Sequence, residues 1–424
     1  MRALRLLPLV LVLAPGFGSP ALAGAQGQPP AAQRPPTDAA VEPATRAEAL
    51  RALREEKAQQ LAPPKPSRLE RLLLDLEGDR LLERLLNPAE GLHPRVGNLT
   101  PGSGIAVGPG YRRPGLFGGH ADFSAFAAAS LDRYWMLDTR LDMPRLAGDT
   151  VSMGLRAQRY EFPDEDFFGL GPGSRRADHV TYALRSSTVG VTGGVRAGPW
   201  LTVGGGLDYL TPSVGDSPDA RRISARVDPA RTPGLESQPD FLRYEGSAVL
   251  NYREPRGNPR LGGRYALTLQ RFNDLEGGRY SFDRVEADLQ QYVPLLRDRR
   301  VLAMHAQVSL ADADGGRQIP FYLQRTLGGP DDLRGFRRFR FRDAHLLLLQ
   351  AEYRWEIFTA VDGAIFYDAG KVASRLEDVN LRDLESDYGI GFRFGTQDGV
   401  FLRIEGAFGS SGGAHFILRF GHVF

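Results

Sequence analysis

The sequence predicts an all-β protein, a transmembrane antiparallel β-barrel of about 16 strands that follows a short N-terminal periplasmic amphipathic helix. Three observations lead to this fold class. The chain begins with an export signal, no later apolar run approaches the roughly 18 residues of a membrane helix, and residues 93–424 alternate apolar and polar positions. A chain that crosses a bilayer without helices must close into a barrel, because only closure satisfies every backbone hydrogen-bonding group in lipid.

The export signal is predicted over residues 1–23. Arg2 and Arg5 precede an apolar stretch that ends at Ala14, and the Ala-Leu-Ala of residues 21–23 fits a cleavage site. The apolar stretch is too short to span a bilayer as a helix. A buried N-terminal helix is the alternative, but the charge, the length and the small residues together favour a cleaved signal peptide.

Two further segments separate the signal from the barrel. Residues 24–66 are rich in Pro, Ala and Gln and are predicted to be a flexible leader. Residues 67–90 are predicted to form an amphipathic periplasmic helix, because a capping box at Ser67 to Glu70 precedes leucines at helical spacing. We expect residues 67–87 to pack on the rest of the chain. The membrane surface, a periplasmic partner or a client polypeptide is the alternative.

The bulk composition excludes several classes of function. Lys and Arg number 53 against 51 Asp and Glu, and this balance argues against a nucleic-acid partner. The absence of Cys excludes disulfides, thiolate metal sites and Cys nucleophiles. No common catalytic motif is present, so we expect no cofactor and no enzymatic activity, and an outer-membrane hydrolase stays an unsupported alternative. Asp312 with Asp314, or Asp331 with Asp332, could bind Ca²⁺, although acidic loop pairs are more often simply solvated.

Residues 346–357 illustrate the strand pattern. Ala351 and Trp355 fall on one face, and Glu352 and Arg354 fall on the other. A period of two over this length indicates a strand with one apolar and one polar side. The predicted strands, about 16 in all, cover residues 93–99, 104–111, 119–129, 131–142, 149–160, 179–197, 201–210, 241–254, 262–273, 279–292, 301–311, 344–357, 361–370, 386–396, 399–408 and 414–424.

The connectors between these strands alternate between short and long. Residues 197–200 and 396–399 are tight turns. Short turns on one side and long loops on the other are typical of an outer-membrane barrel. A soluble β-sandwich or propeller is the alternative, but sandwiches have fewer strands and no blade repeat is evident. The long connectors are 161–178, 211–240, 312–343 and 371–385.

One long connector carries an unusual motif. Leu327–Asp343 reads LGGPDDLRGFRRFRFRD, with arginines between phenylalanines after a glycine turn. This stretch resembles the large-loop signature of the bacterial surface antigen family, the BamA- and TamA-like outer-membrane barrels. The family's Arg-Gly-Phe core matches Arg334, Gly335 and Phe336.

Two strand motifs extend the resemblance, which covers roughly residues 95 to 424. AEYRWEIF is similar to the family's twelfth strand and places Glu352 as its inward carboxylate. FYDAG fits the F-x-D-x-G signature with Phe366, Asp368 and Gly370. The chain ends in Phe424, like the terminal aromatic residue that is read by the outer-membrane assembly machinery.

The resemblance implies a specific interior contact. In the family the long loop folds back into the lumen, so residues 312–343 should do so here, with Arg334 pairing with Glu352 and Asp368. A planar guanidinium can engage both acids through forked hydrogen bonds, which Lys could not do. Breaking a buried pair costs on the order of 3–5 kcal/mol. Bracing of the barrel and a role in gating are both open readings of this contact.

The resemblance also implies a place and a function. The protein should lie in the bacterial outer membrane, inserted there by the assembly machinery and in contact with its lipids. It should aid the insertion or translocation of proteins or lipids through a seam between the first and last strands. The sequence shows no POTRA module before the barrel, which puts docking of client polypeptides in doubt. A passive channel or a structural barrel with a plugged lumen is the alternative.

Overall fold

The computed structural model describes residues 90–419 apart from 220, 256, 296–298, 314, 359–360 and 396–398, and for Phe401 the backbone alone. The predicted signal peptide, the leader, almost all of the predicted helix and Phe424 lie outside the described residues. The described residues form the barrel part of the chain.

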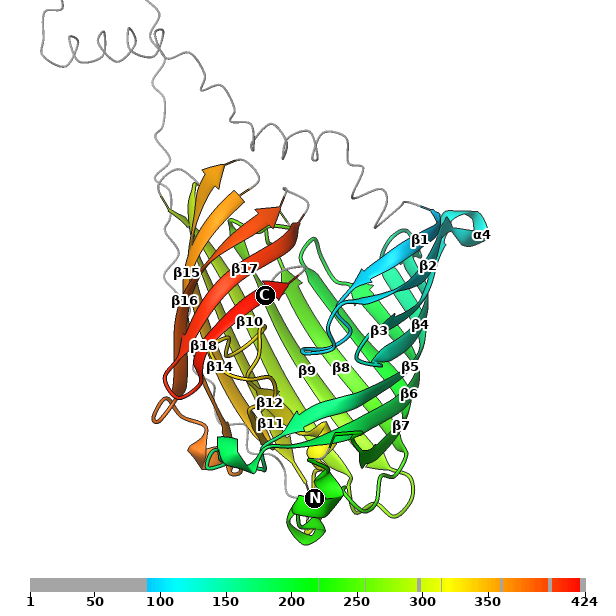
Figure 1. Ribbon diagram of the computed structural model, residues 1–424. Coiled ribbons are helices and arrows are strands. Elements are labelled where there is room, and N and C mark those ends of the chain that lie inside the picture. The colour runs from blue at the N-terminus through cyan, green and yellow to red at the C-terminus, as the bar shows by residue number, and fades with distance from the viewer. Residues whose placement is uncertain are drawn as a thin grey trace, which may run out of the picture. The chain divides into compact units, whose positions relative to one another are not determined.

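Sixteen strands form one antiparallel sheet in which each strand pairs with the next one along the chain. Each strand coincides with one predicted segment, so the predicted all-β fold with about 16 strands is confirmed. Figure 1 shows the sheet curled into a barrel wall. The strands are β1 (Gly91–Gly97), β2 (Ala106–Gly115), β3 (Ala121–Ser130), β4 (Trp135–Leu146), β5 (Val151–Phe167), β6 (Val180–Arg196), β7 (Leu201–Asp216), β8 (Phe241–Asn251), β9 (Gly262–Asp274), β10 (Phe282–Leu295), β11 (Arg300–Asp312), β14 (His345–Phe358), β15 (Val361–Ala373), β16 (Glu385–Gly395), β17 (Val400–Gly409) and β18 (Gly413–Arg419).

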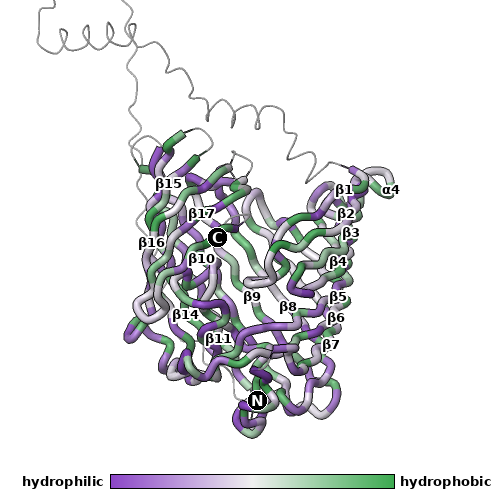
Figure 2. The backbone as a smooth tube through the Cα atoms, viewed as in Figure 1, coloured by the Kyte–Doolittle hydropathy of each residue, from purple (hydrophilic) through white to green (hydrophobic). Residues whose placement is uncertain are grey.

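The alternation of residue types assigns the two faces of this sheet. On β15, Ile365 and Tyr367 are exposed, whereas Phe366 and Asp368 are buried. Figure 2 shows hydrophobic and hydrophilic residues alternating along the strands. Because successive side chains of a strand point to opposite faces, the apolar set faces outward and the polar set faces the lumen.

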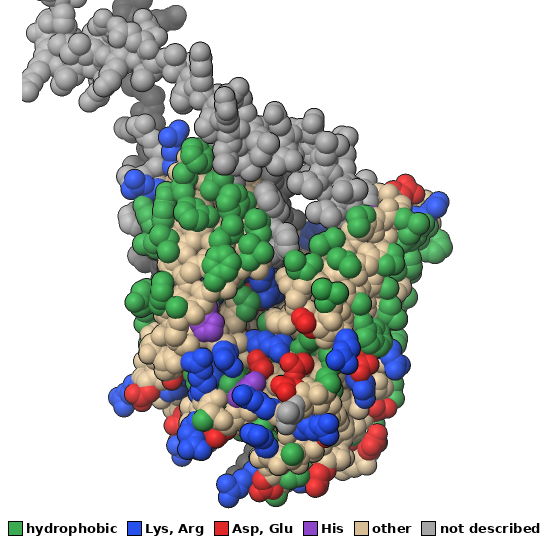
Figure 3. All heavy atoms as spheres, viewed as in Figure 1, with side chains coloured by type: hydrophobic (Ala, Val, Ile, Leu, Met, Phe, Trp, Pro, Cys, Tyr) green, Lys and Arg blue, Asp and Glu red, His purple; other side chains and the backbone are tan. Residues whose placement is uncertain are grey.

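The connectors differ in length between the two ends of the barrel. The long connectors 168–179, 217–240, 313–344 and 374–384 all lie at the same end, which by the rule for outer-membrane barrels is the extracellular one. Figure 3 shows charged side chains gathered toward that end, with apolar side chains over the strands nearer the other end. Within the described part of the chain, none of the helices is long and apolar enough to cross a membrane.

Short helical turns occur only as parts of the connectors that the structure describes. Each of them spans only three or four residues. The turns are α4 (Leu116–Gly119), α5 (Ile223–Arg226), η1 (Arg176–Asp178), η2 (Pro229–Arg231), η3 (Phe321–Leu323) and η4 (Leu376–Asp378).

The sheet has two edge strands, and no ladder among the described residues joins β1 to β18. We call the interval between these two strands the seam. In the first hairpin Pro94 lies opposite Pro109. Neither proline has an N–H, so this pair belongs to the non-hydrogen-bonded kind, and the backbone of Pro94 turns toward the seam. The β2–β3 ladder is interrupted between the Val107 and Gly110 pairs, where Pro109 lies.

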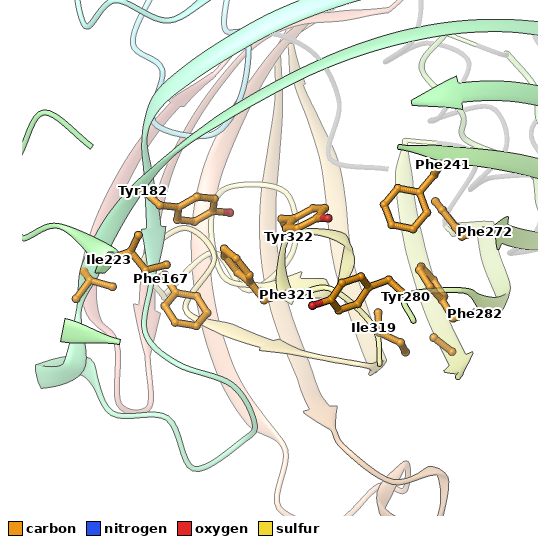
Figure 4. Close-up of a cluster of buried hydrophobic side chains, with 12 residues drawn as sticks. Phe167, Tyr182, Ile223, Phe241, Phe272, Tyr280, Phe282, Ile319, Phe321 and Tyr322 are labelled. Atoms are coloured by element: carbon orange, nitrogen blue, oxygen red, sulfur yellow. The ribbon is translucent and has the colours of Figure 1, made fainter. Parts of the chain in front are cut away.

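An aromatic cluster fills the interior near the extracellular end. Figure 4 shows Phe167 and Tyr182 on one side of the lumen and Phe272 and Phe282 on the other, with Phe321 and Tyr322 of a long connector between them. The ring centroids of Phe167 and Phe321 lie 5.2 Å apart in an edge-to-face contact. Burial of large aromatic surfaces stabilises such a cluster and excludes water from it. We call this cluster the apolar cap, and it occupies the interior at this end.

Two details of the sequence prediction are corrected. The connector 312–343 contains a hairpin, β12 (Arg325–Leu327) paired with β13 (Phe341–Asp343), in place of continuous loop. Strands β5 and β7 run beyond their predicted ends at 160 and 210, to Phe167 and Asp216. The apolar cap explains this extension, because it gives the distal halves of these strands a surface on which to pack.

Candidate functional site

The segment between β12 and β13, residues 328–340, enters the barrel and is called the lumen loop here. Gly328 and Gly329 begin it with φ angles of 111° and 120°, which favour glycine. The Asp332 carboxylate accepts hydrogen bonds from the N–H groups of Gly328 and Leu333, at 3.0 and 2.8 Å, and so closes this turn. An apolar cluster then fixes the loop to the wall, formed by Leu327, Leu333, Phe336, Phe341, Leu346, Leu348 and Val372.

Arg334 lies at the centre of the lumen loop and is fully buried. Its Nε and Nη2 donate to the two carboxylate oxygens of Asp368 on β15, at 2.6 and 2.7 Å. Its Nη1 donates to Glu352 on β14 at 2.7 Å and to Glu405 on β17 at 3.2 Å. Its guanidinium carbon lies 3.4 Å from the centre of the Phe366 ring. The structure thus brings Arg334 to both predicted carboxylates and to a third acid.

Three more arginines surround these acids. Glu352 accepts from Arg354 at 2.7 Å and from Arg393 at 2.5 Å, and Glu405 accepts from Arg403 at 3.0 Å. All of these side chains are almost completely buried. A buried charge is tolerated where opposite charges and hydrogen bonds compensate it, so the residues form one mutually dependent network.

Sequence reasoning did not assign Glu405, Arg354, Arg393 or Arg403 to this site. The available signal was their place on the polar face of an alternating strand, as β17 shows with Arg403 and Glu405. That signal says that a side chain faces the lumen. It does not say which lumenal side chains meet, since this depends on the register of four strands and on the path of the loop.

The glycines and aromatic residues of the motifs have steric roles. A Cβ on Gly335 would lie 2.4 Å from the Gly409 nitrogen and 2.6 Å from the Asp387 Cβ, so only glycine permits this approach to β17. A Cβ on Gly370 would lie 2.8 Å from the Leu347 oxygen. Phe336 is buried in the apolar cluster. The motif positions therefore seat the loop closely against the wall.

A second arginine anchors the lumen loop to the opposite side of the seam. Arg338 donates from Nε to Asp166 on β5 at 2.8 Å, and from Nη1 to the Pro101 oxygen and the Tyr134 hydroxyl, each at 3.0 Å. Pro101 follows β1, and Tyr134 precedes β4. Because Arg334 holds β14, β15 and β17, the loop connects the first strands of the sheet with the last ones.

Replacing Arg338 with alanine should therefore release the loop from the first strands alone. We expect the free energy of unfolding to fall by about 1.5–3 kcal/mol, the range for hydrogen bonds to a charged group. Protease access to residues 328–340 should rise. Urea unfolding in detergent and limited proteolysis measure the two effects, with the exposed Arg222→Ala as control. An Arg338→Ala loop as protected as that of the control would contradict the anchor.

Asp332 adds a pH dependence to the loop. Burial is the main cause that raises the pKa of its carboxyl group from 3.8 to about 7, although part of the residue reaches solvent, and the two N–H donors oppose the shift. Between these two values the folded protein binds a proton that the unfolded chain has lost, so this group makes stability fall as pH rises from about 4 to 7.

Asp332→Asn should remove this dependence, since an amide oxygen still accepts from the two N–H groups. We compare the unfolding midpoint of the variant with that of the wild type at each pH. The difference, variant minus wild type, should be larger at pH 8 than at pH 4.5. Thermal unfolding at the two pH values gives the difference. An equal difference between variant and wild type at both pH values would show that the Asp332 carboxyl does not titrate in this range.

One of the two acidic pairs considered for Ca²⁺, Asp331 with Asp332, has other partners. Asp331 pairs with Arg403 at 3.3 Å and with Arg419 at 2.8 Å. Asp314 lies outside the described residues. In the ranges that the structure describes, no group of three or more metal-ligating side chains occurs.

Comparison with known proteins identifies the fold. Among solved structures, BamA from Haemophilus ducreyi lacking POTRA domains 1-3 is similar at TM-score 0.57 and 17% identity, over 78% of this chain and 70% of that one. CdiB from Acinetobacter baumannii and CdiB from Escherichia coli each give TM-score 0.49 and 12% identity, over 78% and 77% of this chain and 59% and 61% of theirs.

The family is shown by sequence. The family model described as the Omp85 superfamily domain matches residues 116–410, well over half of the chain. The resemblance to BamA-like barrels is thereby confirmed, and between residues 90 and 419 the described chain holds no POTRA-like unit. The chain belongs to the Omp85 superfamily.

Proposed function

We propose that this outer-membrane barrel aids the insertion or translocation of proteins, or of lipids, at the outer membrane, and that the seam is its working edge. The observation that carries the proposal is that no ladder among the described residues joins β1 to β18. Unpaired strand edges offer N–H and C=O groups with which an extended segment can pair.

The apolar cap at the extracellular end supports a lateral route through the wall. The apolar cap, with Phe167, Phe272 and Phe321, crosses the lumen at that end. The lumen loop packs against the inner side of the wall. A polypeptide or lipid inside the barrel would meet packed aromatic side chains in the axial direction. At the seam, by contrast, the strands that the structure describes show no backbone pairing between β1 and β18.

The weakness of the first hairpin supports the same route. β1 is short, and Pro109 interrupts the ladder that joins this hairpin to β3. A strand pair with few cross-strand bonds separates at low free energy, which is what a lateral opening requires. The lumen loop, tied to both sides through Arg334 and Arg338, would then set how far the seam opens.

The alternative is a passive channel or a structural barrel. The charged lumen wall, including the Arg243–Asp208 and Arg264–Asp288 pairs, is the observation that favours it, because polar walls admit water and ions. The cap and the lumen loop argue against a wide axial pore.

Depletion of the protein in its host distinguishes the two functions. We expect the amounts of other outer-membrane proteins, or the lipid asymmetry of the membrane, to change on depletion, and we expect little steady conductance in planar bilayers. Unchanged protein and lipid composition together with large, steady conductance would establish the channel instead.

The chain itself should reach the outer membrane through its cleaved signal and the assembly machinery, and Phe424→Ala should reduce its insertion there. A pull-down from gently solubilised membranes tests whether residues 67–87 hold a client or a periplasmic partner.

A further inference from the structure

A cavity of about 460 Å³ lies at the seam in the extracellular half of the barrel. On one side it is lined by Asn98 and Gly102, from the connector after β1, and on the other by β18 from His415 to Arg419. Residues of the lumen loop form its floor. Its size falls within the roughly 300–1,000 Å³ of small-molecule sites.

The charges that line this cavity are compensated, with one exception. Arg334 and Arg338 are held by the acids described above, and Arg419 pairs with Asp331 at 2.8 Å. Asp166 accepts from Arg338 and lies 2.7 Å from the His179 Nε2. Arg337 is exposed and has neither an ion pair nor a hydrogen bond within the described part of the chain. The lining therefore presents one uncompensated positive charge.

The cavity also has an apolar wall that faces the membrane. Phe416 and Leu418 line it and belong to the outward face of β18, where they are 76% and 51% exposed. The apolar side chains on this face of the barrel contact acyl chains. The lining thus offers a ligand both a cation and side chains that face the lipid.

We propose that this cavity binds a phosphate-bearing anionic lipid, with its phosphate at Arg337 and its acyl chains along Phe416 and Leu418. Guanidinium groups bind phosphate oxygens through charge-assisted hydrogen bonds. A polypeptide strand paired with the β18 edge would leave the Arg337 charge unexplained, since backbone pairing needs no cation. The proposal does not depend on the insertion function, because a lipid at the seam would serve a structural barrel equally well.

The test measures lipid retention by the full-length protein in a neutral detergent. Dimyristoylphosphatidylglycerol and dimyristoylphosphatidylcholine, which share acyl chains and differ in net charge, are added in turn, and bound lipid is counted by native mass spectrometry. We expect the wild type to retain the anionic lipid in preference. Arg337→Gln should weaken that retention about tenfold, as for the loss of one charge-assisted hydrogen bond. Retention of the zwitterionic lipid, whose choline offsets the phosphate charge, should change less than that of the anionic lipid.

The controls separate the alternatives. Arg222→Gln alters an exposed arginine outside the cavity and should behave as the wild type. Equal retention of the anionic lipid by Arg337→Gln and the wild type would overturn the proposal. Displacement by inorganic phosphate at equal concentration would show a small-anion site instead. A photo-crosslinking side chain at Phe416 that captures a polypeptide and no lipid in cells would also overturn it. Heat-modifiable gel mobility shows that each variant is folded.

Discussion

Arg334→Ala is expected to lower the free energy of unfolding of the barrel by about 3–5 kcal/mol. The substitution removes the cation that three carboxylates share, those of Asp368, Glu352 and Glu405. All four side chains have no solvent-exposed surface, so water cannot replace the lost charge. Arg334→Lys should lose a large part of the same stability, because an ammonium group cannot make the paired bonds to both Asp368 oxygens.

The measurement is urea unfolding of the detergent-solubilised protein, with the heat-modifiable gel shift as a second reading. Arg337→Ala is the matched control, since it lies in the same loop without a partner among the described residues. The stabilities of Arg337→Ala and Arg334→Ala are compared in a neutral detergent free of lipid. If Arg334→Ala had the same unfolding midpoint and protease resistance as Arg337→Ala, the buried ion pairs would not stabilise the barrel.

Glu352→Gln is expected to have an effect at least as large, at the upper end of the range, about 5 kcal/mol. Glu352 accepts from Arg334, Arg354 and Arg393, so a neutral side chain leaves three buried cations with less compensation. The amide NH₂ of Gln would also point toward a guanidinium group, where no acceptor replaces the carboxylate oxygen.

Pairwise substitution distinguishes charge balance from packing. Glu352→Gln combined with Arg393→Gln should lose less than the sum of the two single losses, because one charge of each sign is removed. Glu356→Gln, on the same strand but exposed, should change stability by less than about 0.5 kcal/mol. Strictly additive losses in the double variant would mean that the two side chains are energetically independent.

The strands of this fold were accessible to prediction because their signal is local. A period of two over ten or more residues, as in β14 with Glu352 inward and Ile357 outward, is visible without knowledge of any partner strand. The hairpin of β12 and β13 was missed since three residues are too few to show a period. The cap-bound ends of β5 and β7 were missed because their packing partners come from distant connectors.

The residues of the candidate site likewise divide into those that a local motif indicates and those that only the tertiary structure brings together. The motifs indicated that Arg334 would approach Glu352 and Asp368, and the structure brings the three together. Glu405 and Arg338 carried no such indication. Their contacts follow from where the lumen loop runs between distant strands, and that path depends on close approaches such as Gly335 against Gly409, which no local pattern encodes.

The facing prolines of the first hairpin also bear on how neighbouring molecules behave in a crowded membrane. An unpaired edge strand can form backbone hydrogen bonds with a second copy of the protein, and repeated pairing of this kind would produce a polymer. Because Pro94 has no amide hydrogen, an intermolecular strand pair formed by β1 would lack one backbone hydrogen bond near its middle. The missing donor at Pro94 therefore weakens permanent self-association through the edge of β1.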